Sequence, residues 1–356
     1  MQRRSRTSSS HAFTLWLLAA LPACAQTVVL EQGVPDGGAS AGNDGSSSDG
    51  SFADGHCAGQ SQTPKPLSPE VIVALDRSST MAPQIATVLA ALVPEVESYQ
   101  NVIRFGFVDF PDSLQSCPDS CCIGELTPPP AMPTSYTVFD DAAYVCNTPG
   151  TGGFTCPTSA ARPTETALQS CVSYYQRDPQ TGGRFVLLIT DGDPSGQCGD
   201  AKGDCADAEN EVGTLHGLNN NVQTVIVDLG MQSDANDCLH ELATGQGQNG
   251  TLYYYFPGPN GLNDDLASIT NVIASAACHL TLGTPPNDPT QVSVSFFGSP
   301  IAQDKNDGWT LDTGNSVGLT LHGTACQNYI NSHNYPQGLE VTSAGCSTSR
   351  GGQSTF

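Results

Sequence analysis

The fold is decided by the stretch VIVALDRSSTM, residues 71–81. Its first five residues, 71–75, are all apolar, and three of them are β-branched. A run this short and this apolar is typical of a strand buried on both faces of a parallel sheet. The run breaks at once into Asp76, Ser78 and Thr80, at every second position, ahead of a helical pattern. These oxygen-bearing side chains therefore follow the carboxyl end of a buried strand, where open α/β sheets bind ligands.

Two roles fit this turn. Alternate residues of a turn can point the same way, so the carboxylate of Asp76 and the hydroxyls of Ser78 and Thr80 can converge on one point. Oxygen ligands with few charges suit Mg²⁺ or Mn²⁺. One carboxylate cannot neutralise a divalent ion, so such a site needs oxygens from elsewhere in the chain. The alternative is that the hydroxyls only cap the following helix, and the segment alone leaves both readings open.

Two further oxygen-bearing loops favour the metal. Thr164-Glu165-Thr166 opens the amphipathic segment TETALQSCVSYYQ, residues 164–176. A second apolar run, 185–189, leads into Thr190-Asp191-Gly192-Asp193. Because the carboxyl ends of parallel strands lie at one edge of a sheet, these loops can meet the turn after residue 75 at a common rim.

These three motifs, in this order, resemble the von Willebrand factor A family over residues 68–280. The metal-ion-dependent adhesion site of that family uses Asp-x-Ser-x-Ser, a later Thr and a later Asp. The resemblance implies an α/β fold with a doubly wound, mostly parallel sheet and helices on both faces, similar to a Rossmann fold. It also implies a site for Mg²⁺, or Mn²⁺ or Ca²⁺. The matching residues are Asp76, Ser78, Thr80, Thr164 and Asp191.

The sequence departs from the family pattern at two places. Thr80 stands where Ser is usual, which preserves the hydroxyl, and Arg162-Pro163 precede Thr164 where small residues are commoner. The resemblance implies an open coordination position that an Asp or Glu carboxylate of a partner protein fills. Arg77 and Arg162 flank the predicted site and are expected to add charge-assisted hydrogen bonds to that carboxylate.

The leading function is therefore metal-dependent adhesion or binding, without enzymatic activity. Both acidic residues of the site, Asp76 and Asp191, are assigned as ligands, which leaves no general base there. Two alternatives stay open. The domain can be a structural scaffold whose site has no metal function, or the metal can activate water in a hydrolase.

Composition narrows the partners. The chain has 356 residues, and 35 acidic against 12 basic side chains give a net charge of −23. Such acidity argues against nucleic acid, because the phosphate backbone would be repelled. Fourteen cysteines indicate an oxidising compartment and a set of disulfides. We predict the pairs Cys198–Cys205 and Cys326–Cys346, because each closes a short local loop.

The amino terminus has the pattern of an export signal over residues 1–25, with a basic start followed by a short apolar run. Residues 21–24, Leu-Pro-Ala-Cys, resemble a bacterial lipobox, in which Cys24 is lipidated after cleavage. An ordinary signal-peptidase site also fits. The chain is therefore expected to be a cell-surface or outer-membrane lipoprotein, or to be secreted, and to meet a membrane only through this possible anchor. Residues 26–67 are rich in Gly, Ser and Asp and predict a disordered linker.

Four further features complete the predicted organisation. Strands and helices alternate through 68–280, from a helix over 83–99 to a closing helix over 262–280, with an edge strand near 251–257. Residues 112–162 form a Cys- and Pro-rich insertion expected to shape the rim of the metal site. From 281 to 356 short alternating strands predict a small β appendage, with Trp309 as a packing anchor. The three strands lie within 291–298, 316–323 and 338–345.

Overall fold

A computed structural model describes most of the chain beyond residue 59. Two compact units, Met1–Gly55 and His56–Phe356, divide the chain, and every described residue lies in the second. The described residues are 60–111, 123–124, 126–129, 161–178, 182–195, 205–218, 221–230, 238–244, 254–255, 261–286, 288–312, 318–332 and 336–343. Several predictions fall outside them: the signal peptide 1–25 with Cys24, the linker up to residue 59, nearly all of the insertion 112–162, Cys198 and Cys346.

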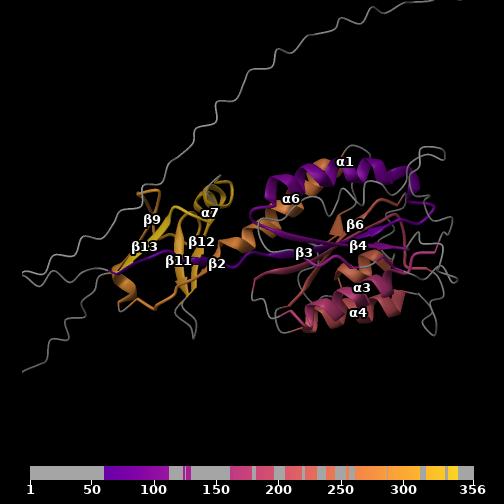
Figure 1. The fold of residues 1–356 in the computed structure, drawn as a ribbon, viewed down its shortest axis with the longest axis horizontal. Helices are drawn as coiled ribbons and strands as arrows, with labels where there is room; N and C mark the ends of the chain where they lie inside the picture. Colours follow the sequence, from indigo (N-terminus) through magenta and orange to yellow (C-terminus); the bar gives the residue numbers. More distant parts are fainter. Residues whose placement is uncertain are drawn as a thin grey trace, which may run out of the picture. The chain divides into compact units, whose positions relative to one another are not determined.

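A five-stranded parallel sheet forms the centre of the α/β part (Figure 1). Its strands stand in the order β4-β3-β5-β6-β7, and every neighbouring pair is parallel. The first strand, β3, therefore lies inside the sheet with β4 on one side and β5 on the other. The predicted parallel sheet and its edge strand are confirmed. The bounds are β3 Glu70–Asp76, β4 Arg104–Phe110, β5 Arg184–Thr190, β6 Gln223–Asp228 and β7 Tyr254–Tyr255.

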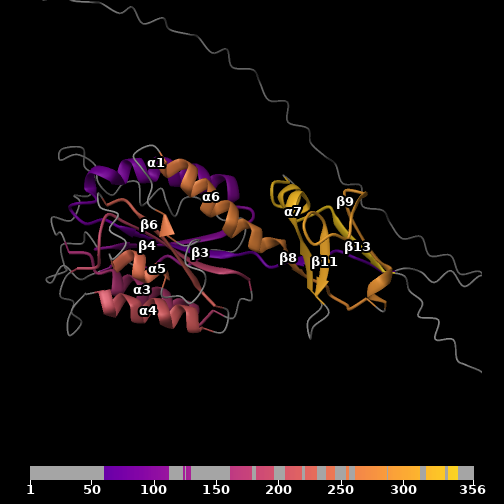
Figure 2. The same cartoon turned by 180° about the vertical axis from the view of Figure 1, so that it is seen from behind.

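Helices cover both faces of this sheet, as the fold class predicts (Figures 1 and 2). Alternate residues of β3 explain why: Val71, Val73 and Leu75 pack into one buried cluster, whereas Ile72 and Ala74 pack into another. The first cluster includes side chains of α1 and α6, and the second includes those of α3, α4 and α5. The helices are α1 Ala82–Tyr99, α3 Thr164–Tyr175, α4 Cys205–Gly217, α5 Cys238–Thr244 and α6 Leu262–Ser275.

The closing helix ends earlier than predicted. The periodic pattern predicts a helix as far as residue 280, but α6 ends at Ser275 and a short 3₁₀ turn, Ala276–Cys278, follows. Strand β8, His279–Thr281, then begins. Leu280 pairs with Leu319 of the appendage, so sheet pairing overrides the helical pattern at this end.

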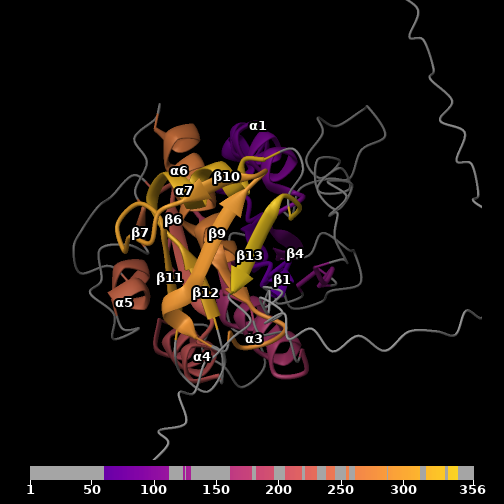
Figure 3. The same ribbon diagram turned by 90° about the vertical axis from the view of Figure 1, so that its left-hand side faces the viewer.

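Two antiparallel four-stranded sheets make up the β appendage, and all three predicted strands are present as β9, β12 and β13 (Figure 3). The predicted linker, 26–67, extends too far. Residues 60–62 pair with β13 and residues 65–66 pair with β8, so both belong to the folded appendage. One sheet contains β1 Gln60–Gln62, β13 Leu339–Ser343, β9 Val292–Phe296 and β10 Ser299–Ile301. The other contains β11 Trp309–Asp312, β12 Gly318–Leu321, β8 His279–Thr281 and β2 Lys65–Pro66.

Trp309 anchors the appendage as predicted. Its side chain is buried in a cluster with residues of both sheets, and its indole Nε1 donates a hydrogen bond of 3.0 Å to the carbonyl oxygen of Ile301. A helix that the sequence analysis did not predict, α7 Gly323–Ile330, packs beside these strands and contributes Tyr329 to the same cluster. No helix in the described part of the chain is long and apolar enough to cross a membrane.

Both predicted disulfides are wrong. Cys205 is bonded to Cys238 rather than to Cys198, and Cys326 is bonded to Cys278 rather than to Cys346. The bonds span sequence separations of 33 and 48 residues. The first joins the starts of α4 and α5, which pack against each other, so helix packing rather than a short loop brings the sulfurs together.

Cys171 is a free cysteine buried in α3. Burial raises the pKa of its thiol to about 12, because the thiolate would have no water around it. Since the thiolate is the reactive form, we expect Cys171 to resist alkylation by iodoacetamide at pH 8 in the folded protein and to react fully in guanidinium. Mass spectrometry of the peptide that contains Cys171 measures this. Labelling of the folded protein at the unfolded rate would contradict the buried placement.

Candidate functional site

The candidate site lies at the carboxyl edge of the parallel sheet, between β3 and β5. Asp76 is the last residue of β3, and Asp191 follows Thr190, the last residue of β5. From β3 the chain crosses to β4 on one side, and the later strands build outward from β5 on the other. The point between β3 and β5, where the strand order reverses, is the switch point of the sheet. The loops on its two sides diverge and leave a crevice, which is where open α/β sheets bind ligands.

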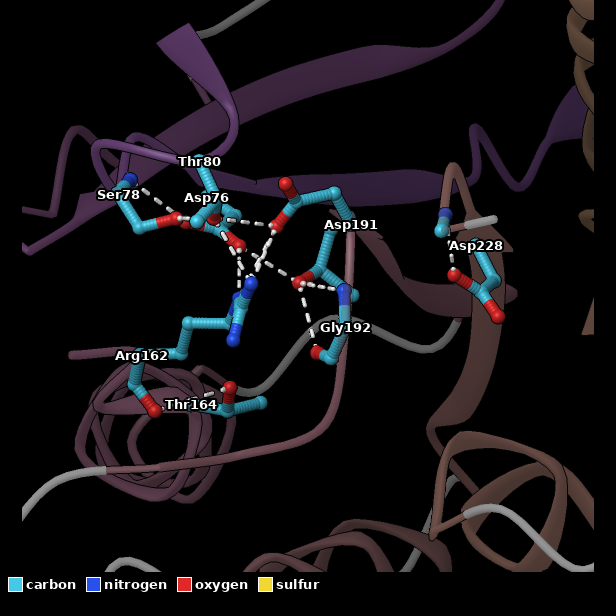
Figure 4. A network of polar contacts seen from close by, with 10 residues as sticks. Asp76, Ser78, Thr80, Arg162, Thr164, Asp191, Gly192 and Asp228 are labelled. Atoms are coloured by element: carbon cyan, nitrogen blue, oxygen red, sulfur yellow. Dashed lines mark hydrogen bonds and ion pairs between the residues drawn. The ribbon is translucent and has the colours of Figure 1, made fainter. Parts of the chain in front are cut away.

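Asp76 is the buried centre of the site. Its Oδ1 accepts a hydrogen bond of 2.7 Å from the Ser78 amide, and its Oδ2 accepts one of 2.7 Å from the Thr190 hydroxyl (Figure 4). Burial raises the pKa of the Asp76 carboxyl above its ordinary value, and the negative charge of Asp191 adds to the increase. The bonds from Ser78 and Thr190 lower the pKa but do not cancel the effect of burial. A positive charge beside Asp76 would therefore stabilise its ionised form.

The hydroxyls of Ser78 and Thr80 point into this site. Ser78 Oγ and Thr80 Oγ1 are 3.0 Å apart, and Thr80 Oγ1 donates to Asp191 Oδ1 at 3.0 Å. They do not cap the next helix, because α1 has Met81 at its N-cap and no side-chain capping bond. The capping alternative is therefore wrong.

The chemistry and spacing of these oxygens fit a small divalent ion. The four side chains offer oxygen donors only, two of them carboxylates. Adjacent ligands in an octahedral Mg²⁺ shell, each about 2.1 Å from the ion, lie about 3.0 Å apart. The oxygen–oxygen distances from Ser78 to Thr80 and from Thr80 to Asp191 are both 3.0 Å. Four of the five predicted ligands are thus brought together.

Thr164, the fifth predicted ligand, makes a different contact. It is the first residue of α3 and is 1% exposed. Its Oγ1 donates a long hydrogen bond of 3.4 Å to the carbonyl oxygen of Arg162, not to another predicted ligand. In this arrangement Thr164 stands beside the site and supports the segment that carries Arg162.

Arg162 extends into the site rather than flanking it (Figure 4). Its Nη2 donates to Thr80 Oγ1 at 2.8 Å and lies 2.9 Å from Asp191 Oδ1. Its Nε donates to the same Asp191 oxygen at 3.0 Å and lies 3.4 Å from Asp76 Oδ2. The guanidinium thus contacts three of the predicted metal ligands. The expected hydrogen bonds from Arg162 to a partner carboxylate stay a prediction, because the guanidinium is here bonded to side chains of the site itself.

The backbone of Arg162 is held by the loop after β5. Its amide donates to the Ser195 carbonyl at 2.6 Å, and the Ser195 amide donates back at 3.0 Å. The guanidinium also packs on Gly192, where an added Cβ would lie only 3.1 Å from Arg162 Cζ. The insertion 112–162 was expected to shape the rim of the metal site. Among its described residues, Arg162, the last one, reaches the site.

Arg77 does not face a partner. Its side chain is 4% exposed and is paired with the carboxylate of Asp109 on β4. The expected role of Arg77 in partner binding is therefore wrong. Its buried guanidinium, paired with Asp109, instead supports the turn after β3. Sequence reasoning missed Asp109 as its partner, although Asp109 stands near the carboxyl end of the neighbouring strand.

Two other polar residues at this edge were given no role by the sequence analysis. Thr190 holds Asp76, and Asp228 at the end of β6 accepts a hydrogen bond of 2.8 Å from the Gly230 amide (Figure 4). Their position in the sequence could have revealed both, because each is the last residue of a buried strand. A polar residue at that position in a parallel sheet lies at the edge where ligands bind.

Comparisons with known proteins find similarity only among solved structures. No protein-family model matches the sequence, and no curated protein matches it. The pilus adhesin SpaC from Lactobacillus rhamnosus GG, in its open conformation, is 12% identical over 79% of this chain and 38% of its own, with a TM-score of 0.44. This chain therefore spans less than two fifths of SpaC.

Two further structures have comparable scores. The manganese-loaded TRAP protein of Plasmodium vivax is 11% identical over 61% of this chain and 77% of its own, with a TM-score of 0.42. Proximal thread matrix protein 1 from the mussel byssus, with a zinc-occupied MIDAS motif, is 15% identical over 62% of this chain and 50% of its own, with a TM-score of 0.37.

Proposed function

We propose that this chain is an exported binding protein built around a von Willebrand factor A-type domain over residues 68–280. Its site takes a divalent cation, Mg²⁺ first and Mn²⁺ or Ca²⁺ as alternatives, and captures a carboxylate of a protein partner. One observation carries the proposal: oxygen donors from two separate loops stand 3.0 Å apart at the switch point of the sheet. The proposed ligands are Asp76, Ser78, Thr80, Thr164 and Asp191.

Each residue has a part in this function. Asp76 is fixed by Ser78 and Thr190 and supplies the buried charge. Ser78 and Thr80 supply neutral oxygens, so the site keeps only two protein carboxylates. When bound, the cation supplies the positive charge that attracts an Asp or Glu side chain of the partner. Thr164 joins the ligands when its hydroxyl gives up the long hydrogen bond that it now donates to the carbonyl oxygen of Arg162.

The setting of the protein is part of the proposal. A signal peptide over 1–25, with Cys24 as a lipidation site or as part of an ordinary cleavage site, would place the chain at the cell surface, in the outer membrane or in the medium. The bonds Cys205–Cys238 and Cys278–Cys326 support an oxidising compartment. The net charge of −23 supports a protein partner over nucleic acid. We propose no enzymatic activity, because both site carboxylates serve as ligands.

A structural scaffold without metal function is the second candidate. It is favoured by the guanidinium of Arg162, which already supplies a positive charge between Asp76 and Asp191. The two candidates differ in whether the purified protein binds a divalent cation, so a metal titration separates them.

Asp191→Ala is expected to weaken Mg²⁺ or Mn²⁺ binding by on the order of 100-fold, because the charge of the ligand set is a main determinant of affinity at oxygen sites. Isothermal titration calorimetry of the full chain measures this. The matched control is Asp193→Ala, which removes the same charge from an exposed position two residues away and should stay within about twofold of wild type, because exposed charges are screened.

A pull-down with Mg²⁺ or with EDTA then tests the partner. Capture that depends on Mg²⁺ and is lost in Asp191→Ala supports a carboxylate-binding site. Absence of any heat of metal binding in the wild type, together with capture that is unchanged in EDTA, would instead support the scaffold.

A further inference from the structure

We infer that Arg162 is a built-in cation that occupies this site in the metal-free protein and leaves it when a divalent ion binds. The inference rests on the proposed cation site and adds a regulatory residue to it. The two carboxylates of Asp76 and Asp191 lie close together, and the only positive group that the described residues bring into contact with both of them is the Arg162 guanidinium.

The guanidinium and a metal ion need the same oxygens. Arg162 Nη2 lies 2.8 Å from Thr80 Oγ1 and 2.9 Å from Asp191 Oδ1, which are two of the proposed ligand atoms. Nη2 donates to Thr80 Oγ1 and Nε donates to Asp191 Oδ1, so these two groups point their hydrogens at lone pairs that would bind the ion. An ion bonded to those oxygens would also meet a second positive charge at contact distance. The two cations therefore exclude each other.

Only the side chain of Arg162 has to move. The backbone is fixed by both hydrogen bonds to Ser195, so the segment can keep its place. The side chain is 17% exposed, in contrast to 4% for the buried Arg77, so it has a direct path to solvent. Once released it lies at the rim of the site, where it can form charge-assisted hydrogen bonds with the carboxylate of a partner.

This exchange links cation binding to partner recognition. While Arg162 is inside the site, its guanidinium is bonded to Asp76 and Asp191. The apparent cation affinity is then reduced by the fraction of molecules in which Arg162 is inside. Cation binding would both fill the site and free an arginine for the partner, so capture should rise with cation concentration as the site fills.

The test compares Arg162→Gln with wild type by calorimetric titration of the full chain with MgCl₂ and MnCl₂. We expect the variant to bind at least about tenfold more tightly, which equals about 1.4 kcal/mol. The matched control is Arg177→Gln, which removes one positive charge from an exposed position just after α3, remote from the ligands. It should change the affinity by less than about twofold, because exposed charges are screened.

A second readout does not depend on bound metal. In EDTA the melting temperature of Arg162→Gln should fall by about 3 °C, because two close carboxylates lose their counter-ion. Saturating Mg²⁺ should restore it to the wild-type value. A purely structural arginine would give a loss that Mg²⁺ does not reverse, and that result would overturn the inference.

Gly192→Ala provides an independent route if Arg162→Gln folds poorly. The new methyl group would lie 3.1 to 3.3 Å from the guanidinium atoms, so the side chain must give way by a few tenths of an ångström, which weakens its contacts with the site. We expect tighter cation binding in this variant too. If wild type binds the cation and neither variant binds it more tightly, the inference fails while the proposed function stands. If wild type and both variants all bind none, the cation site itself is refuted and the inference fails with it.

Discussion

Replacing Arg77 by methionine is expected to lower the free energy of unfolding by about 3 kcal/mol, within the range for breaking a buried ion pair by removing one partner. Arg77 is 4% exposed, and its guanidinium is paired with Asp109, whose side chain is 12% exposed. Methionine keeps most of the apolar volume but leaves the Asp109 carboxylate without this charge. Urea denaturation with the disulfides intact measures the loss.

Two comparisons identify the cause. Arg177→Met changes an exposed arginine and should cost less than about 0.5 kcal/mol. The double variant Arg77→Met/Asp109→Leu should recover much of the lost stability, because replacing both members of a buried pair by apolar groups is often neutral. A variant Arg77→Met that is as stable as wild type but fails to capture the partner would restore the partner-binding role that the sequence suggested.

The oxygen-bearing side chains of the candidate site could be predicted because their signal is local. Asp76, Ser78 and Thr80 follow a run of apolar residues that reads only as a buried strand, and Asp191 follows another. Parallel pairing of β3 with β5 then places both turns at one edge without further information. The parallel sheet and the helices on its two faces could be predicted in the same way, from local hydrophobic patterns.

The roles of the arginines could not be predicted in this way. Whether Arg77 faces inward depends on Asp109, which is 32 residues away in sequence and meets it only through strand pairing. The direction of Arg162 depends on its bridge to Ser195 and on the space that Gly192 leaves beside it. Neither partner has a fixed sequence spacing to its arginine. A basic residue near a predicted cation site can therefore act in two ways. It can compete with the cation, or it can contact the partner carboxylate that the cation binds.

Long-range pairing also explains why the predicted linker extends too far. Residues 60–62 are Gln-Ser-Gln, a polar composition that resembles the linker before them. They become a strand only because β13, nearly 280 residues later, offers an edge with which they pair. Composition cannot reveal such a partner.

Removing the disulfide Cys278–Cys326 is expected to lower the free energy of unfolding by about 4 kcal/mol, the loop-entropy estimate for a closed loop of this length. The sequence separation is 48 residues. The bond joins the 3₁₀ turn after α6 to α7, so it ties the last helix of the α/β part to the helix of the appendage. The test is the double variant Cys278→Ala/Cys326→Ala, compared with wild type by urea unfolding without reductant.

The single variant Cys278→Ala decides whether Cys326 is bonded to Cys278 or to Cys346. If Cys326 were bonded to Cys346, the closed loop would be shorter, the expected loss smaller, and Cys278→Ala alone would leave the bond intact. With the observed pairing, Cys278→Ala alone frees the Cys326 thiol, and peptide mapping under non-reducing conditions would find it alkylated only after unfolding, since Cys326 is 5% exposed. In excess reductant, wild type and double variant should unfold at nearly the same urea concentration, because the cross-link that distinguishes them is then absent from both. A stability difference that persists in reductant would attribute the loss to side-chain packing around Cys278 and Cys326 and not to the bond.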